Sequence, residues 1–275
     1  MGSKAGILVA SFGTSSEEMR QRAIDPLERE IAAAFPGRVA YTAWESTRIV
    51  EKLREERGEV HMTLDEALAR IAEDGITDLV VQPTFLIRGV EMQELETKLA
   101  AWKPAHTTVR LGAPLLTSAA DRSALVGMLA EEFATLGPED MLVIMGHGSY
   151  YGGNEVYFHM NEEFKARGLS HFFIATLKDE LPFSAAIEAV EARQPKQVHL
   201  VPLMMVAGRH ATVDMEGANP QSWESQLKAR GYAVRCYRRG LGELPAVREL
   251  LVQHAQEALI IEEKCAKAES AEGEQ

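Results

Sequence analysis

Cysteine and long hydrophobic runs are what this sequence has least of. Its 275 residues include two cysteines, Cys236 and Cys265, which lie far apart along the chain. Two cysteines exclude a disulfide framework and a metal site built from several thiolates. No run of about 18 apolar residues occurs, so we expect no membrane-spanning helix and no membrane partner. The N-terminus has no apolar segment before a cleavage site, which favours a cytoplasmic protein; an export signal already removed would leave the same sequence.

Positive charge is also scarce. The chain has 29 basic and 41 acidic residues, which gives a net charge of −12 at pH 7. Without a basic block, we expect no nucleic-acid partner. The sequence lacks a Walker A motif, a G-x-G-x-x-G after the first apolar run and a G-x-S-x-G elbow, so we also expect no nucleotide cofactor. If the ligand is acidic, positive charge must be concentrated locally.

The sequence does contain a regular alternation of short apolar runs and longer amphipathic segments. With 46% hydrophobic and 25% charged residues, the chain can bury a sizeable core. The apolar runs predict strands at residues 7–11, 39–44, 78–82, 108–111, 141–145, 172–176, 198–205 and 232–236. Helical spacing, with N-caps at Ser15, Thr63 and Asn219, predicts helices at residues 15–35, 63–73, 91–102, 119–135, 154–165, 183–193, 219–231 and 245–262. This alternation predicts an α/β fold with parallel sheets covered by helices on both faces.

The two halves of the chain carry the same motifs in the same order. Segment 83–91 begins with proline, has glycine at its seventh position and ends on Glu91, and segment 202–210 repeats this pattern but ends on His210. Glycine-containing turns at 13–14 and 146–149 close the first strand of each half. The match indicates an internal duplication. It predicts two lobes and a polar tail: residues 1–125, 126–265 and 266–275.

Three side chains with catalytic chemistry follow predicted strands. In open parallel sheets, ligands bind beyond the carboxyl ends of the strands, and His147, Glu91 and His210 each follow such an end. Two lobes facing each other would bring both imidazoles and the carboxylate into one cleft. This set suits a divalent first-row metal such as cobalt(II), nickel(II) or iron(II), and it suits proton removal. A histidine after a strand is more often structural, but the glycines beside His147 let a ligand approach closely.

Two arginines flank the glycines of the repeated segments. Arg88 precedes Gly89, and Arg209 follows Gly208. As bidentate donors they are candidates to bind ligand carboxylates. Solvated loop arginines are an equally good interpretation of the same pattern.

Three runs of this sequence resemble the anaerobic cobalt chelatases of the CbiK type. They are Val-Ala-Ser-Phe-Gly-Thr-Ser at 9–15, Met-Gly-His-Gly at 145–148, and 202–211 with the Asp-Met pair at 214–215. The resemblance covers nearly the whole chain. It implies a class II chelatase fold, with two Rossmann-like lobes related by a pseudo-two-fold. It also implies insertion of cobalt(II) as substrate into the tetrapyrrole sirohydrochlorin, without ATP, on the anaerobic route to cobalamin.

The resemblance also assigns roles to single residues. His147 and His210 match the family's two active-site histidines and Glu91 its first-lobe glutamate, so these three would hold the metal and perform catalysis. Residues expected to contact the macrocycle are Phe12, Gly13 and Thr14 in the opening run, together with Arg88 and Arg209.

Lys178 departs from the family pattern. Relatives often carry a glutamate shortly after the second strand of the second lobe, where it can join the metal site, and Lys178 stands there unless Asp179 or Glu180 takes that place. Lysine would leave the metal site incomplete or contact a substrate carboxylate.

Three other functions stay open on the sequence alone. One is an iron or nickel chelatase for the same macrocycle, and another is a tetrapyrrole- or haem-binding protein without catalysis, which Lys178 favours. The third, a two-lobe solute-binding protein, is disfavoured by the absence of an export signal. Apolar faces on the terminal helices are compatible with a homo-oligomer.

Overall fold

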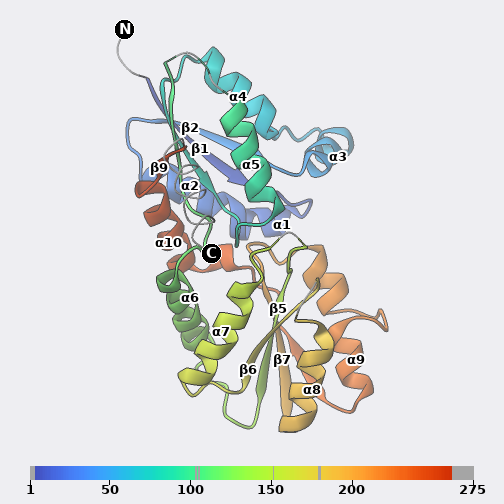
Figure 1. Cartoon of the computed structure of the whole chain (residues 1–275). Helices are drawn as coiled ribbons and strands as arrows, with labels where there is room; N and C mark the ends of the chain where they lie inside the picture. The colour runs from blue at the N-terminus through green and yellow to red at the C-terminus, as the bar shows by residue number, and fades with distance from the viewer. Residues whose placement is uncertain (1–3, 103, 105, 151, 179–180, 262–275) are drawn as a thin grey trace. The chain divides into compact units, whose positions relative to one another are not determined.

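The described part of the chain forms two compact α/β units (Figure 1). This computed structural model describes residues 4–102, 104, 106–150, 152–178 and 181–261. The first unit comprises residues 1–115 and 245–275, and the second comprises residues 116–244. The α/β class and the parallel sheets predicted from the sequence are confirmed in both units.

The first unit is built on a five-stranded sheet of order β2-β1-β3-β4-β9. Strands β1 (Ala5–Ser11), β2 (Val39–Trp44), β3 (Asp78–Pro83) and β4 (Thr108–Leu111) run parallel, and the short β9 (Leu259–Ile260) pairs antiparallel with β4. The helices are α1 (Glu17–Met19), α2 (Asp25–Ala33), α3 (Thr47–Arg57), α4 (Leu64–Glu73), α5 (Val90–Ala101) and α10 (Pro245–Gln256). A π-helical turn, η1 (Arg20–Ile24), joins α1 to α2.

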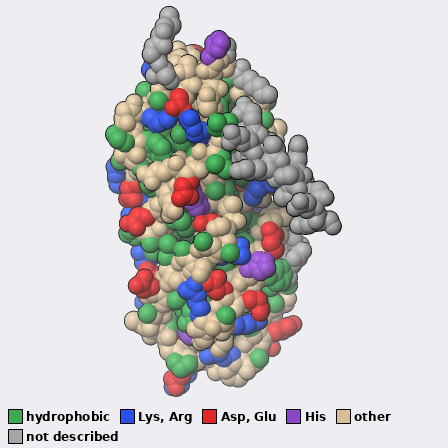
Figure 2. Space-filling view, turned by 60° about the vertical axis from the view of Figure 1, so that its left-hand side comes forward, with side chains coloured by type: hydrophobic (Ala, Val, Ile, Leu, Met, Phe, Trp, Pro, Cys, Tyr) green, Lys and Arg blue, Asp and Glu red, His purple; other side chains and the backbone are tan. Residues whose placement is uncertain are grey.

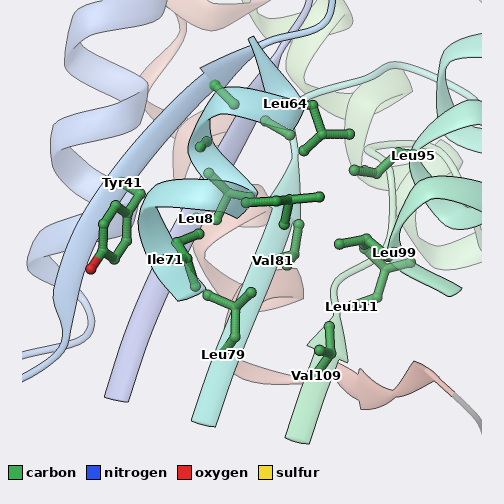
Figure 3. Close-up of a cluster of buried hydrophobic side chains, with 14 of the residues drawn as sticks. Leu8, Tyr41, Leu64, Ile71, Leu79, Val81, Leu95, Leu99, Val109 and Leu111 are labelled. Atoms are coloured by element: carbon green, nitrogen blue, oxygen red, sulfur yellow. The ribbon is translucent and has the colours of Figure 1, made fainter. Parts of the chain in front are cut away.

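Helices cover both faces of this sheet. On one face, Leu8 and Val81 pack against Ile71 of α4 and Leu95 of α5, and all four side chains are fully buried (Figure 3). On the other face, α10 packs against α2 and β3. Burial on both sides explains why β1 is a continuous apolar run and not an alternating one.

The second unit is built on a four-stranded, fully parallel sheet of order β6-β5-β7-β8. Its strands are β5 (Met141–Gly146), β6 (Phe172–Thr176), β7 (Gln197–Leu203) and β8 (Ala233–Cys236). Its helices are α6 (Ala119–Glu132), α7 (Glu155–Ala166), α8 (Phe183–Arg193) and α9 (Trp223–Ala229). A π-helical turn, η2 (His210–Met215), follows β7, and a 3₁₀ turn, η3 (Leu241–Glu243), follows β8.

The two sheets repeat the same order of their first four strands, which supports the internal duplication. The match extends to single hydrogen bonds beyond the strand ends. The Ser46 N–H donates to the Phe12 carbonyl over 3.2 Å in the first unit, and the Lys178 N–H donates to the His147 carbonyl over 3.1 Å in the second. Phe12 is therefore the first-unit counterpart of His147, and Ser46 is the counterpart of Lys178.

The division into units differs from the one predicted. The chain enters the second unit at Leu116, earlier than the predicted boundary between 125 and 126, and it returns to the first unit at Pro245. Helix α10 was expected in the second lobe but packs on α2, and Arg248 pairs with Glu30 there at 2.8 Å. Helical periodicity indicates which face of a helix is buried, but not which sheet buries it. The predicted tail, 266–275, lies outside the described residues.

Two predicted N-caps were each misplaced by a few residues. The first helix is capped by Ser16, whose hydroxyl accepts from the Met19 N–H over 3.3 Å, and not by Ser15. Helix α9 is capped by Ser222, and not by Asn219. Serine and asparagine all suit this position, so neighbouring candidates compete and local composition does not decide between them.

Two features of the described residues concern the surface charge and the length of the helices. On the face seen in Figure 2, basic side chains are interspersed with acidic ones, without a continuous basic patch among the described residues. In that same part of the chain, no helix is both long and apolar enough to cross a membrane.

Candidate active site

Two histidines of the second unit lie side by side. His147 follows β5, and His210 opens the π-helical turn η2 after β7, the strand that pairs with β5. The centroids of their rings are 5.0 Å apart, and the ring planes are tilted by 59°. The carboxyl ends of adjacent parallel strands meet at one edge of a sheet, which explains how residues 63 positions apart in sequence meet here.

The Nδ1 atom of each ring is engaged in a hydrogen bond. His147 Nδ1 lies 2.9 Å from the Gly148 carbonyl oxygen, and His210 Nδ1 lies 2.6 Å from Oδ2 of Asp214. A carbonyl or a carboxylate can only accept, so Nδ1–H is the donor in both pairs. In the neutral rings the lone pair then lies on Nε2, which is the atom able to bind a metal ion.

Gly148 determines the shape of the loop that carries His147. Its φ is +73°, and a Cβ added there would lie 2.2 Å from the carbonyl oxygen of Lys178. That same carbonyl accepts a hydrogen bond from the Thr176 hydroxyl at 2.7 Å. Glycine at this position therefore lets the loops after β5 and β6 approach in backbone contact, which holds His147 in place.

The π-helical turn aligns Asp214 with His210. The two residues are four positions apart on η2, and the turn is anchored by Ala211 and Met215, whose side chains are fully buried. Single π-turns are frequent at functional sites. Asp214 lies in a run that the sequence analysis singled out, but its role toward His210 was not predicted.

Two carboxyl groups gather at the equivalent edge of the first sheet. Glu91 is in the first turn of α5, after Gly89, and Glu45 directly follows β2. Burial raises the pKa of Glu45 to about 7, Lys98 counters the rise, and the charge of Glu91 adds to it. Glu45 was not predicted from the sequence, although a polar side chain directly after a predicted strand is the signal that singled out other site residues.

A half-buried carboxyl lies behind the same edge. Glu28 of α2 accepts from the Ser11 hydroxyl and from the Trp44 indole N–H, each over 3.4 Å. The Thr84 hydroxyl extends this series of hydrogen bonds by donating to the Ser11 hydroxyl over 3.1 Å. Burial raises the pKa of Glu28 to about 7, more than its hydrogen bonds lower it. Nothing in the local sequence pattern distinguishes this glutamate from an exposed one.

The opening run at 12–14 divides into one exposed ring and two residues that shape the loop. Phe12 is 50% exposed, which leaves its ring accessible to a ligand. Gly13 has a φ of +91°, and a Cβ there would lie 2.7 Å from the Trp44 ring. Thr14 is buried, and its hydroxyl accepts from the Ser16 N–H over 3.2 Å. Of the three predicted contact residues, Phe12 is the one whose side chain is presented outward.

The two predicted arginines are in different states. Arg88 makes a two-pronged ion pair with Glu96 of α5, at 2.8 Å and 3.3 Å. Arg209 is exposed, and within the described residues its guanidinium group makes no ion pair. Arg209 is thus the better placed of the two to meet an anionic ligand.

Solved structures share this fold. SirB from Bacillus subtilis with Fe3+ superposes with a TM-score of 0.62 at 13% identity, over 92% of this chain and 95% of that one. CbiX, described as the terminal enzyme for biosynthesis of siroheme in denitrifying bacteria, superposes with a TM-score of 0.56 at 18% identity, over 92% of this chain and 99% of that one. The fold is therefore of the same two-unit α/β class as that of SirB and CbiX.

A model of the family described as cobalt chelatase (CbiK) matches residues 5–260, so the chain belongs to this family. It is 32% identical over 261 residues to the sirohydrochlorin cobaltochelatase of Salmonella typhimurium, covering 93% of this chain and 97% of that one. It is 31% identical over 257 residues to the sirohydrochlorin cobaltochelatase CbiKC of Nitratidesulfovibrio vulgaris, covering 91% and 89%. The family predicted from the three sequence runs is confirmed.

Proposed function

We propose that this protein inserts cobalt(II) into sirohydrochlorin without ATP, on the anaerobic route to cobalamin. The observation that carries the proposal is the pair His147 and His210, whose rings lie 5.0 Å apart with both Nδ1 atoms engaged. The names of both relatives and the family match support this reaction over solute binding. A cytoplasmic location, a homo-oligomer and the absence of a nucleic-acid partner stay predictions.

Cobalt(II) is the substrate metal in this proposal. The Nε2 atoms of His147 and His210 bind it, with the carboxylate of Glu91 assisting, because imidazole nitrogen and carboxylate oxygen suit a divalent first-row ion. Among the described residues, no group of three or more His, Cys, Asp or Glu side chains is arranged to hold a metal ion.

Insertion exchanges the metal for two protons on the pyrrole nitrogens. The neutral imidazoles, or the carboxylate of Glu91, accept these protons as the metal–nitrogen bonds form. Nδ1–H donation to Asp214 keeps His210 in the tautomer that presents a basic Nε2. The histidines therefore serve both the metal and the departing protons.

The macrocycle needs cationic and apolar contacts in this proposal. Its peripheral carboxylates pair with Arg209, and also with Arg88 if the ion pair of Arg88 with Glu96 opens or is bridged. The exposed ring of Phe12 offers a flat apolar surface to the macrocycle, while Gly13 and Thr14 hold that ring in place.

The test follows the visible spectrum of sirohydrochlorin mixed anaerobically with cobalt(II) and the protein. We expect His147→Ala and His210→Ala to lower the insertion rate at least a hundredfold, while His159→Ala, an exposed histidine of α7, keeps it. Wild-type rates in both site variants would show that the site is wrong. Tight pigment binding with no acceleration in the wild-type protein would favour the non-catalytic alternative.

The same experiment addresses the choice of metal. Imidazole and carboxylate ligands accept iron(II) and nickel(II) as well as cobalt(II). We expect cobalt(II) to be inserted fastest when the three ions are compared at equal concentration. A faster rate with iron(II) or nickel(II) would leave the site assignment intact and change the substrate metal.

A further inference from the structure

Lys178 brings a cation to the loop beside His147. Its backbone is fixed by two contacts, because its N–H donates to the His147 carbonyl over 3.1 Å and its carbonyl oxygen lies against Gly148. Both contacts use main-chain atoms, so the position of residue 178 is determined whatever its side chain is. The side chain is therefore available for another role.

The side chain of Lys178 lies over an exposed aromatic ring. Its Nζ is 5.3 Å from the centroid of the Tyr150 ring, within the range of a cation–π contact. Tyr150 is 69% exposed, and within the described residues Lys178 makes no ion pair with an acid. An ammonium group has three N–H donors, and an aromatic ring face is a weaker acceptor for them than a carboxylate oxygen. The pair thus presents donors and an apolar face together on an open surface.

The charge of Lys178 indicates which kind of ligand this surface takes. A protonated ammonium group cannot coordinate a metal ion, and it repels one by Coulomb's law. It attracts a carboxylate instead. In the second unit, Lys178 and Arg209 lie next to the two histidines in the backbone, since Arg209 precedes His210 and Lys178 bonds to His147. A macrocycle centred on the histidine pair would direct its peripheral acids toward both cations.

We propose that Lys178 and Tyr150 form a carboxylate-binding subsite that selects tetrapyrroles with anionic side chains. The inference rests on the proposed function, because it takes the macrocycle to be centred on His147 and His210. The Lys178 ammonium pairs with one substrate carboxylate, and the Tyr150 ring packs on the carbon atoms that carry it. The net charge of −12 disfavours the approach of such a substrate to the chain as a whole, and a local cation offsets this effect.

The test measures kcat and KM for sirohydrochlorin, with cobalt(II) saturating. Lys178→Met keeps the aliphatic stem and removes the charge, so we expect KM to rise about tenfold with little change in kcat. Lys178→Arg is expected to restore a KM near that of the wild type. Lys165→Met on α7, an exposed lysine away from this loop, is the matched control and is expected to change neither constant.

A second substrate separates charge recognition from a general effect on the site. The neutral methyl ester of sirohydrochlorin has the same ring but no carboxylates, so the wild type and Lys178→Met should bind it equally when binding is followed by fluorescence without metal. Titration with cobalt(II) alone reports whether the histidine pair is intact in each variant, and we expect no variant to bind cobalt(II) more weakly than the wild type.

The outcomes distinguish the two proposals. If the wild type inserts cobalt(II) and Lys178→Met shows an unchanged KM, the subsite is overturned while the proposed function stands. The subsite is also overturned if Lys178→Met weakens binding of the ester and binding of the free acid by the same factor. If the wild type neither binds nor metallates sirohydrochlorin, the proposed function fails, and the subsite fails with it.

Discussion

At the scale of single residues, the chemistry of the candidate site depends on what lies behind the reacting atoms. Asp214 does not face the metal in our proposal, yet its oxygen at 2.6 Å from His210 Nδ1 decides which nitrogen of that ring carries the lone pair. Such a carboxylate also makes the imidazole a stronger ligand. A residue of this kind acts through its neighbour, so its effect is on positioning.

Asp214→Ala should weaken cobalt(II) binding roughly tenfold to a hundredfold, because His210 loses its fixed tautomer and ring orientation. Titration of the cobalt absorption bands measures this affinity. Asp214→Glu, which keeps an acceptor, should recover part of it, and ¹⁵N spectra should show mixed tautomers for His210 in the alanine variant alone. Unchanged affinity in Asp214→Ala would contradict the positioning role.

The half-buried Glu28 carboxyl gives the free energy of unfolding a pH dependence. Burial raises its folded-state pKa from 4.5 to about 7, so the folded protein holds this proton more tightly than the unfolded chain does. The stabilisation is fully present below pH 4.5 and is lost as the pH rises through 7. Glu28→Gln removes the titration and keeps an acceptor for Ser11 and Trp44.

We therefore expect the free energy of unfolding of Glu28→Gln to be close to that of the wild type at pH 5. At pH 8 we expect it to be higher than that of the wild type by on the order of 2 kcal/mol. Urea unfolding at pH values between 5 and 8 measures the difference. A constant difference across this range would mean that Glu28 does not titrate there.

At the scale of elements, the loop after β5 illustrates why some glycines are required. Gly148 and Gly168 have nearly the same backbone angle, with φ of +73° and +77°, but a Cβ at Gly168 meets nothing within 4 Å. A Cβ at Gly148 would collide with a carbonyl oxygen. Comparing the two positions separates the cost of the angle from the cost of the collision.

Gly168→Ala should cost about 1 kcal/mol in the free energy of unfolding, from the left-handed angle alone. Gly148→Ala should cost more and should also lower the insertion rate, because the backbone of His147 or Lys178 must move. Urea unfolding and the spectral assay measure the two effects. Equal stability losses with full activity in both variants would show that the loop yields without disturbing His147.

The elements also show where sequence patterns inform and where they fail. The eight predicted strands are present, because a short apolar run between turn residues is typical of a buried strand. Helix α3 was not predicted, since its segment Thr47–Arg57 is mostly charged and buries little beyond Val50 and Leu53. The predicted helix 245–262 ends at Gln256 in the structure, and β9 follows by pairing with β4, a partner distant in sequence.

The same reasoning applies to the site. His147 and His210 could be predicted to meet, because each follows the end of a strand and such ends lie together. Glu45 follows a predicted strand and carries the same signal, although it was not predicted. Glu28 could not be predicted, since its raised pKa comes from burial by parts of the chain that the local sequence does not reveal. The sequence shows the type of each residue, but the structure was needed to show which other residues it contacts.

At the scale of the whole molecule, the first unit is made from both ends of the chain. Residues 116–244 form the second unit, and α10 then returns to cover the first sheet with Val247 and Leu251, which are fully buried. Pro114 and Pro245 stand beside the two unit boundaries, but neither proline indicates which sheet the following helix covers. The duplication was visible in the sequence, but this return was not.

This return has a consequence for biosynthesis. A ribosome releases the chain from its N-terminus, so every residue of the second unit leaves the exit tunnel before α10 does. Until then α2 and β3 lack the helix that packs against them, and uncovered apolar surface invites aggregation or a chaperone. The unit whose sequence begins first is therefore the last to be completed in the cell.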